Sequence, residues 1–415
     1  TTDNTNGNAL YTLAGSLTSS GVANSTRDLN APSGWDGTSY AASRAAAPFS
    51  ILFPIYDTIQ QFSAADPAVA FPPLELRWSV NNRPASGDLT VGEIGTSFYS
   101  SDSGSVYILG AADNDTDEYD HHIIIHEWGH YFEDKISRAD SIGGEHGAGD
   151  RLDPRVAMGE GFGNALSGIS LNDPLYNDSS GVGQNSGFSI DLESNTGSNL
   201  GWFSEASVQS ILYDIFDSVD DGADTISLGI TPLYNAFVST EYKTTPFYTT
   251  IFSYIDRLEA DNASSAAALR SLLAAQGING TGPDGAGETT AGGIPTSLPI
   301  YKTATVGGAP IEVCSVDDAG GDNKLGVREY VSFQAASAGA YTLAMVRTSG
   351  AVNRDPDFTI NVLGKRVGAA QSGVNDSETL TINLNAGQHI VDAYDALNLD
   401  PASQSDSCYS FQISQ

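Results

Sequence analysis

EYDHHIIIHEWGHYFEDKI, residues 118–136, decides how the rest of the sequence is interpreted, because it contains the pattern H-E-x-x-H at His126, Glu127 and His130. Apolar residues before the motif and aromatic residues after it favour a buried helix over about 120–137. On a helix, two His four residues apart project from one face and can hold one Zn²⁺, while Glu127 lies beside them facing the water that attacks the substrate. A chain of this composition is expected to contain only about 0.003 such matches by chance. The motif therefore predicts a zinc site.

A zinc hydrolase needs a third protein ligand and an open fourth position. Glu133 and Asp134 follow on the same helix, but their Cα atoms would lie about 10 to 12 Å from the first His, so we interpret them as solvent-facing. Glu160, in RVAMGEGFGNALSGI, is the better candidate, because a lone acid in a small and apolar helix is costly to bury without a partner. The glycines around it would let its helix approach the HEWGH helix closely. His146, in a glycine-rich loop, stays open as an alternative ligand.

Asn164 lies one turn after Glu160 and is expected on the same helix face. There it could hydrogen-bond a zinc-binding His and fix its orientation. A simple hydrogen bond between two helices is the alternative role.

HEWGH and MGEGFGN together resemble the gluzincin zinc metallopeptidases, the relatives of thermolysin and fungalysin. The resemblance covers about residues 95–220 and implies protein or peptide substrates. It also implies a catalytic fold with a sheet and a helical part, in which SVYILG (105–110) is similar to the edge strand that aligns substrate by β-addition. Thermolysin-like enzymes carry Asp where this chain has Asn164. The resemblance implies the following site: His126, His130 and Glu160 as zinc ligands and Glu127 as general base.

Thermolysin-like enzymes also use a His after the ligand Glu to donate a hydrogen bond to the oxyanion, and here the next His in the sequence, His389, belongs to the C-terminal part. Tyr213, in ILYDIFD, could supply a phenol instead, with core packing as its alternative role. His146 and Arg155 are further candidates, and Trp202 stands near the place where the fungalysin pattern has its His.

The chain is predicted to be an α+β protein with two domains. Residues 1–290 form the catalytic domain, with an irregular lead-in over 1–40 that is rich in Ser, Thr, Asn and Gly. Residues 277–299, almost all Gly, Pro and small polar residues, are predicted to be a linker, so we expect residues 1 to about 295 to fold and cleave small peptides alone. Short alternating runs, from REYVSFQA to CYSFQIS, predict an all-β sandwich over 300–415. Apolar spacing predicts further helices at 43–62, 154–171, 203–218, 246–259 and 263–275, and strands at 74–80 and 105–110.

SAGAYTLAMV, NRDPDFTINVLG and NAGQHIVDAYD resemble the β-sandwich modules behind secreted bacterial peptidases, the pre-peptidase C-terminal type. The resemblance implies export, and a module that either binds substrate or a surface or is removed on maturation. Cys314 stands near the first strand of this part and Cys408 near the last, as in a bridge that ties the ends of a sandwich. Two unpaired buried cysteines are the alternative.

The chain has 18 Lys and Arg against 51 Asp and Glu, a formal net charge of -33. Such a charge repels nucleic acids and anionic membranes, and no run approaches the roughly 20 apolar residues of a membrane span. An acidic surface is typical of proteins in saline or marine water, with an ordinary acidic secreted protein as the alternative. Because the sequence starts at TTDN without Met or a signal segment, we expect a trimmed product of an exported bacterial protein.

The acidic run DNDTDEYD, residues 113–120, resembles an EF-hand in its alternate acids, Asp115 and Asp117 among them, but lacks that loop's Gly and final Glu. We interpret its last acids as a cap on the zinc helix. An irregular Ca²⁺ site is the alternative there, and also at DDAGGDN (317–323).

The predicted function is that of a secreted zinc metalloendopeptidase, with Zn²⁺ as cofactor. A zinc aminopeptidase is one alternative. An adhesion or binding protein with a relic zinc site is the other, although the Glu beside the metal would have no purpose in a purely structural site.

Overall fold

The computed structural model describes residues 1–415 except 18, 20, 148, 196, 198, 220–223 and 318–319. It forms two compact units. Unit 1 consists of Thr1–Ile136 and Gly163–Leu192, and unit 2 of Ser137–Phe162 and Glu193–Gln415. Helix α3 (Pro154–Leu171) is continuous. Its first half belongs to unit 2 and its second half to unit 1.

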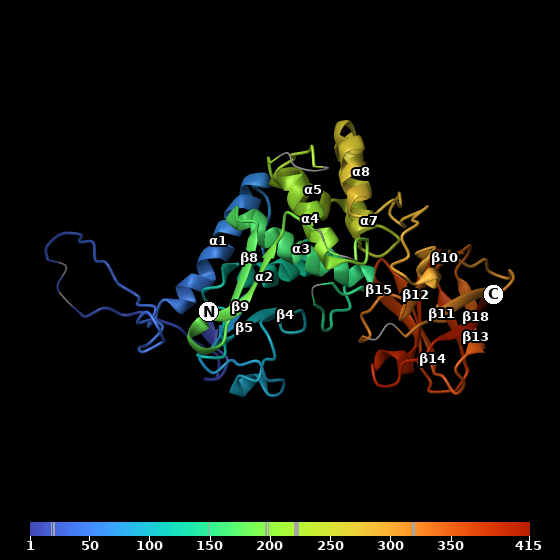
Figure 1. The fold of residues 1–415 in the computed structure, drawn as a ribbon, viewed down its shortest axis with the longest axis horizontal. Coiled ribbons are helices and arrows are strands. Elements are labelled where there is room, and N and C mark those ends of the chain that lie inside the picture. The colour runs from blue at the N-terminus through green and yellow to red at the C-terminus, as the bar shows by residue number, and fades with distance from the viewer. Residues whose placement is uncertain are drawn as a thin grey trace. The chain divides into compact units, whose positions relative to one another are not determined.

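Unit 1 is built from two small sheets and two long helices (Figure 1). Its elements are β1 (Thr2–Asp3), β2 (Ala9–Leu10), α1 (Ala47–Ala65), β3 (Glu75–Trp78), β4 (Phe98–Ser100), β5 (Ser105–Ile108), β6 (Gly110–Ala111), β7 (Asp115–Thr116), α2 (His121–Lys135), β8 (Leu175–Ser180) and β9 (Ser186–Asp191). One sheet has the strand order β2-β1-β3-β5-β4, and the other has β6-β7-β8-β9. The first residues of the predicted irregular lead-in thus join a sheet, because Thr2 pairs with Arg77.

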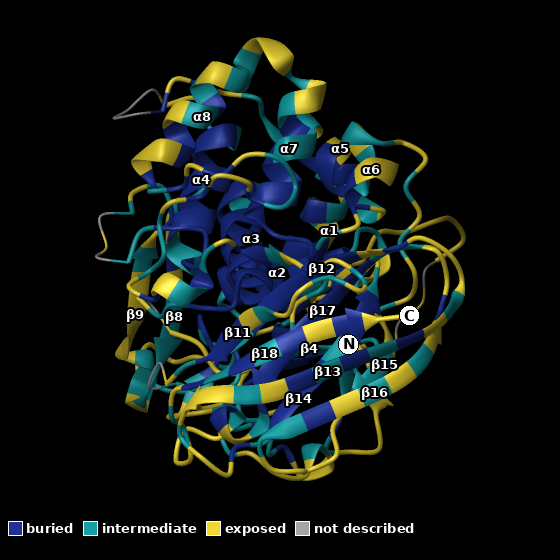
Figure 2. Ribbon diagram, turned by 90° about the vertical axis from the view of Figure 1, so that its right-hand side faces the viewer, coloured by how far each residue is buried: buried dark blue, intermediate teal, exposed yellow. Residues whose placement is uncertain are grey.

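Helix α2 forms the centre of unit 1 and is buried along most of its length (Figure 2). The side chain of Phe62, from α1, packs against Trp128 and Phe132, with ring centroids 5.6 and 4.8 Å apart. The hydroxyl of Tyr131 donates a hydrogen bond to the carbonyl of Pro72. Aromatic residues within and after the HEWGH motif therefore anchor the helix in the core.

The strand expected at the edge of the sheet lies inside it. β5, which contains most of SVYILG, pairs with β3 on one side and β4 on the other. All of its residues are buried, whereas those of β4 are half-buried. An apolar run alone does not tell which side of a strand is paired, so the sequence pointed to the wrong strand. β4, antiparallel to β5, is the edge strand.

Unit 2 combines helices with a β-sandwich. Its helices are α4 (Glu205–Phe216), α5 (Ile230–Val238), α6 (Thr240–Lys243), α7 (Ile251–Asp261) and α8 (Ala266–Ala275). Its strands are β10 (Tyr301–Thr303), β11 (Ile311–Ser315), β12 (Arg328–Ala335), β13 (Gly339–Gly350), β14 (Pro356–Val362), β15 (Lys365–Ala370), β16 (Ser377–Leu384), β17 (Gly387–Asp395) and β18 (Ser407–Ser414). The strand orders β10-β12-β17-β14-β15 and β11-β18-β13-β16 form two sheets that enclose a common apolar core.

The disulfide expected in the sandwich is present. Cys314 and Cys408 are bonded to each other and lie directly opposite on β11 and β18. The bridge therefore joins the early strand β11 to the last strand of the sandwich, as the positions of the two cysteines in the sequence predicted.

Residues 277–299 differ from the loose linker that their composition suggested. Ile278 and Ile294 are buried, and the carboxylate of Glu288 is also buried. The four backbone N–H groups that donate to this carboxylate are those of Asn279, Gly280, Thr289 and Thr290. The segment is packed into unit 2, because a buried carboxylate organises its glycine-rich turns.

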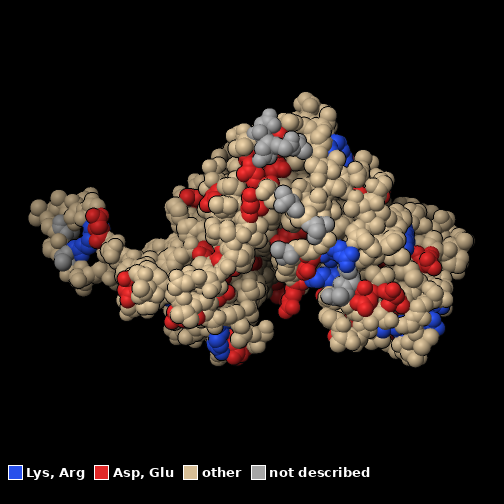
Figure 3. Space-filling view, viewed as in Figure 1, with Lys and Arg blue, Asp and Glu red and all other residues tan. Residues whose placement is uncertain are grey.

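No helix in the described part of the chain is long and apolar enough to cross a membrane. Acidic side chains are spread over the face seen in Figure 3, where Lys and Arg are fewer, as the composition requires.

Candidate functional site

Helix α2 carries both His of the HEWGH motif on one side. His126 Nε2 and His130 Nε2 lie 3.1 Å apart, and the two rings are close to perpendicular at 83°. Each ring thus turns its Nε2 atom toward the same point. Both side chains are largely buried, with His126 6% exposed.

The Nδ1 atoms of the two His face acceptors. His126 Nδ1 donates to Asn164 Oδ1 at 2.8 Å, an arrangement that leaves Nε2 as the nitrogen able to bind a metal. His130 Nδ1 lies 3.7 Å from the carboxylate of Glu133. Glu133 is 3% exposed, so its interpretation as a solvent-facing residue was wrong, whereas Asp134 is exposed as expected. Glu133 lies three residues after His130, close enough for the two side chains to meet on one helix face.

Gly163 allows α3 to approach His126. A Cβ atom at this position would lie 2.9 to 3.0 Å from three atoms of the imidazole ring. Gly161 allows a close approach to α4 instead, because a Cβ atom at this position would lie 2.5 Å from Val208. The expectation that these glycines let the helix approach the HEWGH helix closely is confirmed for Gly163, whereas Gly161 lies against α4 instead.

Glu127 points to the edge strand. Its Oε2 accepts a hydrogen bond of 2.8 Å from the backbone N–H of Tyr99, in the middle of β4. The side chain is 8% exposed. The Tyr99 hydroxyl donates a hydrogen bond of 2.6 Å to Asp134. Tyr99 thus ties β4 to α2 through both its backbone and its side chain.

Glu160 lies on α3, one turn before Asn164, and its carboxylate contacts His146. His146 Nε2 is 3.1 Å from Glu160 Oε2, and its Nδ1 is 2.9 Å from Glu205 Oε2. Burial alone would lower the pKa of His146, but its hydrogen bonds to the two carboxylates outweigh burial and raise this pKa to about 10. The predicted loop His therefore lies beside the predicted third ligand.

One ligand atom from each of His126, His130 and Glu160 lies within 4.8 Å of the other two. Continuous helices supply all three residues, since α2 carries the pair of His and α3 carries Glu160, one turn before Asn164. Two imidazoles and one carboxylate are the ligand set of the His₂Glu catalytic zinc sites.

The other candidate donors are engaged elsewhere or buried. Trp202 donates its indole N–H to the carbonyl of Thr290, at 2.8 Å. Arg155 is buried in ion pairs with Asp153 and Asp392. Tyr213 is buried in α4, with 4% exposure.

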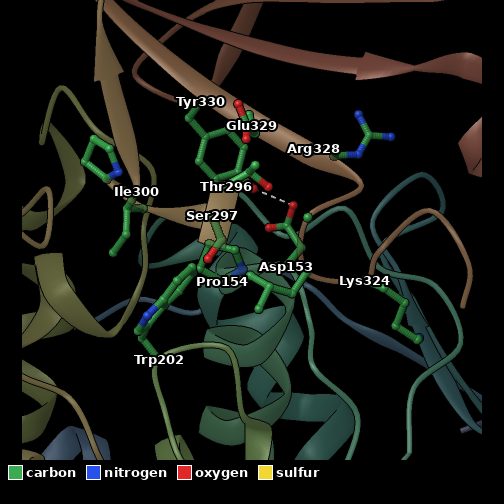
Figure 4. Close-up of a pocket in the computed structure, with 13 residues that line it drawn as sticks. Asp153, Pro154, Trp202, Thr296, Ser297, Ile300, Lys324, Arg328, Glu329 and Tyr330 are labelled. Atoms are coloured by element: carbon green, nitrogen blue, oxygen red, sulfur yellow. Dashed lines mark hydrogen bonds between the residues drawn. The ribbon is translucent and has the colours of Figure 1, made fainter. Parts of the chain in front are cut away.

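Arg155 and Asp153 stand at the start of α3, next to a small pocket of unit 2 (Figure 4). The pocket is lined by residues of four segments: the start of α3, Trp202, the stretch from Thr296 to Ile300, and the region that leads into β12. In the figure, the Tyr330 hydroxyl points at the Asp153 carboxylate, to which it donates a hydrogen bond. None of the candidate zinc ligands lines this pocket.

The acidic run before α2 does not cap the helix as expected. Asp120 is the residue before the first turn, yet its side chain makes no capping hydrogen bond. Its Oδ2 instead accepts from the backbone N–H and the hydroxyl of Ser179, at 2.9 and 2.8 Å. The capping prediction was wrong because a partner distant in sequence, on β8, competes for the carboxylate.

A family model described as the Mycolysin C-terminal domain matches residues 74–275, a range that includes HEWGH and Glu160. No curated protein is similar to the chain at a significant level.

Several solved structures each match a part of the chain. The pre-peptidase C-terminal domain of a collagenase from Bacillus anthracis is 14% identical over 27% of this chain and 93% of that one, with a TM-score of 0.21. A family 35 carbohydrate binding module from Clostridium thermocellum is 20% identical over 21% of this chain and 68% of that one, with a TM-score of 0.16. Scores this low carry no argument about function.

Proposed function

We propose that the protein is a secreted zinc-dependent metalloendopeptidase, with His126, His130 and Glu160 as zinc ligands and Glu127 as general base. The observation that carries the proposal is the convergence of three ligand atoms within 4.8 Å, beside a glutamate of the same motif. The family match supports it, because the Mycolysin C-terminal domain is associated with secreted metallopeptidases.

The ligand residues fit zinc in chemistry and in spacing. Zinc bonds of 2.0–2.1 Å in a tetrahedral arrangement set two ligand nitrogens about 3.3 Å apart. The Nε2 atoms of the two His are 3.1 Å apart, so little movement would bring them to that spacing. When bound, zinc would supply Lewis-acid chemistry that polarises the scissile carbonyl and a water molecule.

The side chains around the ligands have distinct tasks. Asn164 fixes the His126 ring by accepting from its Nδ1, and Glu133 lies where it can do the same for His130. Glu127 takes a proton from the attacking water and passes it to the leaving amine. The Tyr99 N–H holds the Glu127 carboxylate in one orientation for both transfers.

Strand β4 offers the substrate a place to bind. It is the last strand of its sheet, so its outer edge can pair with an extended peptide through main-chain groups other than the Tyr99 N–H, which already donates to Glu127. Its contact with Glu127 puts that edge next to the general base. Binding of this kind needs no free α-amine on the substrate, which favours an endopeptidase over an aminopeptidase.

The test is Glu127→Gln in the purified full-length protein. The amide cannot act as a base, but no zinc ligand is lost, so zinc should stay near one per chain while kcat/KM on a denatured protein substrate falls at least about 100-fold. Zinc is measured by atomic emission, and the cleavage sites by mass spectrometry of the products.

Glu241→Gln is the matched control, because it removes an exposed carboxylate on α6 and should leave the rate unchanged. Full activity of Glu127→Gln would refute the mechanism. Release of only single N-terminal residues would identify an aminopeptidase, and a zinc-containing protein with no hydrolysis of any peptide would favour a binding protein.

A further inference from the structure

A second group of possible metal ligands lies in unit 1, in the sheet β6-β7-β8-β9. Asp115 is on β7, Asp117 follows that strand, and Asp178 is on β8. Asp115 pairs with Ser180, and Asp178 stands two residues before Ser180, so the side chains of Asp115 and Asp178 are on the same face of the sheet. One carboxylate oxygen from each of the three Asp lies within 4.8 Å of the other two.

Each of these carboxylates keeps one buried oxygen without a hydrogen-bond partner, namely its Oδ1 atom. Asp117 is the most deeply buried of the three, with 3% exposure. Its Oδ2 accepts a hydrogen bond from the hydroxyl of Ser97, while its Oδ1 has no hydrogen-bond partner. Buried acceptors are normally paired, so a cluster of three carboxylates that each keep an unpaired oxygen calls for a missing donor or a cation.

The groups that act on these carboxylates do not supply the compensation. The charges that influence Asp117 are those of Asp115, Asp178 and Asp120, all carboxylates. Three carboxylates gathered within 4.8 Å of one another, one of them only 3% exposed, are costly to keep together without positive charge among them.

We propose that Asp115, Asp117 and Asp178 bind a calcium ion. All the ligand atoms are carboxylate oxygens, which suit a hard cation rather than zinc. Calcium takes ligands at 2.3–2.6 Å, so oxygens on opposite sides of the ion are about 5 Å apart, which agrees with a cluster that spans no more than 4.8 Å. Waters complete the six to eight ligands that calcium requires.

The ion joins two parts of unit 1 around the start of helix α2. Asp115 and Asp117 belong to the segment that leads into α2, and Asp178 belongs to the hairpin of β8 and β9, which packs against α2. Asp120, the residue before the helix, is already bonded to Ser179 of the same hairpin. Calcium should therefore stabilise the segment that positions the HEWGH helix and should raise the unfolding temperature of the protein.

The experiment uses the full-length protein carrying Glu127→Gln, in which self-cleavage is suppressed if the proposed function is correct. The protein is stripped with chelator, reloaded with one equivalent of zinc and titrated with CaCl₂ by calorimetry, and its unfolding temperature is measured with and without calcium. We expect one calcium per chain and a higher unfolding temperature with calcium. Asp117→Asn and Asp178→Asn should each weaken calcium binding at least about tenfold and remove most of the temperature shift.

Asp102→Asn is the matched control, because Asp102 is an exposed acid of the same unit and should bind calcium like the parent. A protein that binds no calcium at millimolar concentration would overturn the proposal, and so would binding that Asp117→Asn and Asp178→Asn leave intact. If either variant fails to fold, its unfolding temperature without calcium reveals it, and Asp115→Asn then serves as the third test. Zinc content and hydrolysis are separate readouts, so failure here leaves the proposed function standing.

Discussion

Single residues decide whether the two His can bind a metal, and Gly163 is one of them. Alanine at this position would improve helix propensity by about 1 kcal/mol, but its Cβ would lie 2.9 Å from the His126 ring. A ring held by Asn164 cannot move away freely, so the clash should win. We predict that Gly163→Ala lowers the zinc content and weakens zinc affinity at least about tenfold.

Gly161→Ala provides the control for that prediction. Its Cβ would meet Val208 instead of a zinc ligand, so it should lower the unfolding temperature while zinc affinity is retained. Equal zinc affinity in both variants would show that α3 can shift without disturbing His126.

His146 is the better-supported candidate for the oxyanion donor, because its Nε2 lies 3.1 Å from the carboxylate of the proposed zinc ligand Glu160. We predict that His146→Ala lowers kcat about 100-fold with zinc retained, while Tyr213→Phe stays near the parent rate. The kcat values and the zinc content of both variants show which of the two residues is the oxyanion donor. Loss of zinc from His146→Ala would mean that this His instead positions Glu160.

At the level of elements, the local sequence pattern predicted the bounds of single helices and strands well. Helix α3 has the bounds that apolar spacing predicts, 154–171, and β12 coincides with REYVSFQA. Strand pairing is not a local property, which is why β5 was taken for the edge strand. The burial of Glu133 was also missed, because the exposure of a helix residue depends on which other parts of the chain cover that face of α2.

Strand β12 carries a buried carboxylate that makes stability depend on pH. Burial raises the pKa of Glu329 to about 7, against the opposing effect of Lys302, while Glu312 adds a small further increase. A raised folded-state pKa means that the folded protein binds the proton more tightly than the unfolded chain does. The resulting stability is full below pH 4.5 and is lost as the pH rises toward 7.

We therefore predict that the free energy of unfolding falls by up to about 3 kcal/mol between pH 5 and pH 8 through this group. Glu329→Gln in the Glu127→Gln background should flatten that decline, measured by urea unfolding at each pH. Glu312→Gln, which removes an exposed carboxylate on β11, should leave most of it. An unchanged slope in Glu329→Gln would assign the pH dependence to other acids.

For the whole molecule, composition suggested a division at 277–299, whereas the compact units divide the chain elsewhere. The reason lies in contacts that no linear pattern reveals. Within unit 2, the guanidinium of Arg155, at the start of α3, pairs with Asp392 of β17 and lies over the Tyr330 ring of β12. The helices and the sandwich of this unit therefore share buried charge, and the expectation of few contacts across the segment was wrong.

That sharing predicts that residues 1–299 do not fold as the full chain does. Removal of the sandwich would leave Arg155 without Asp392 and without the Tyr330 ring, and a buried ion pair that loses one partner costs about 3 to 5 kcal/mol. In the full chain, Asp392→Asn should lower the free energy of unfolding by about 3 kcal/mol, measured by urea unfolding. The control Asp400→Asn, in an exposed turn, should lower it by less than about 0.5 kcal/mol. The truncated chain should lose its cooperative melt. A fragment 1–299 that melts cooperatively and still cleaves small peptides would show instead that the helices around α3 are stable without the sandwich.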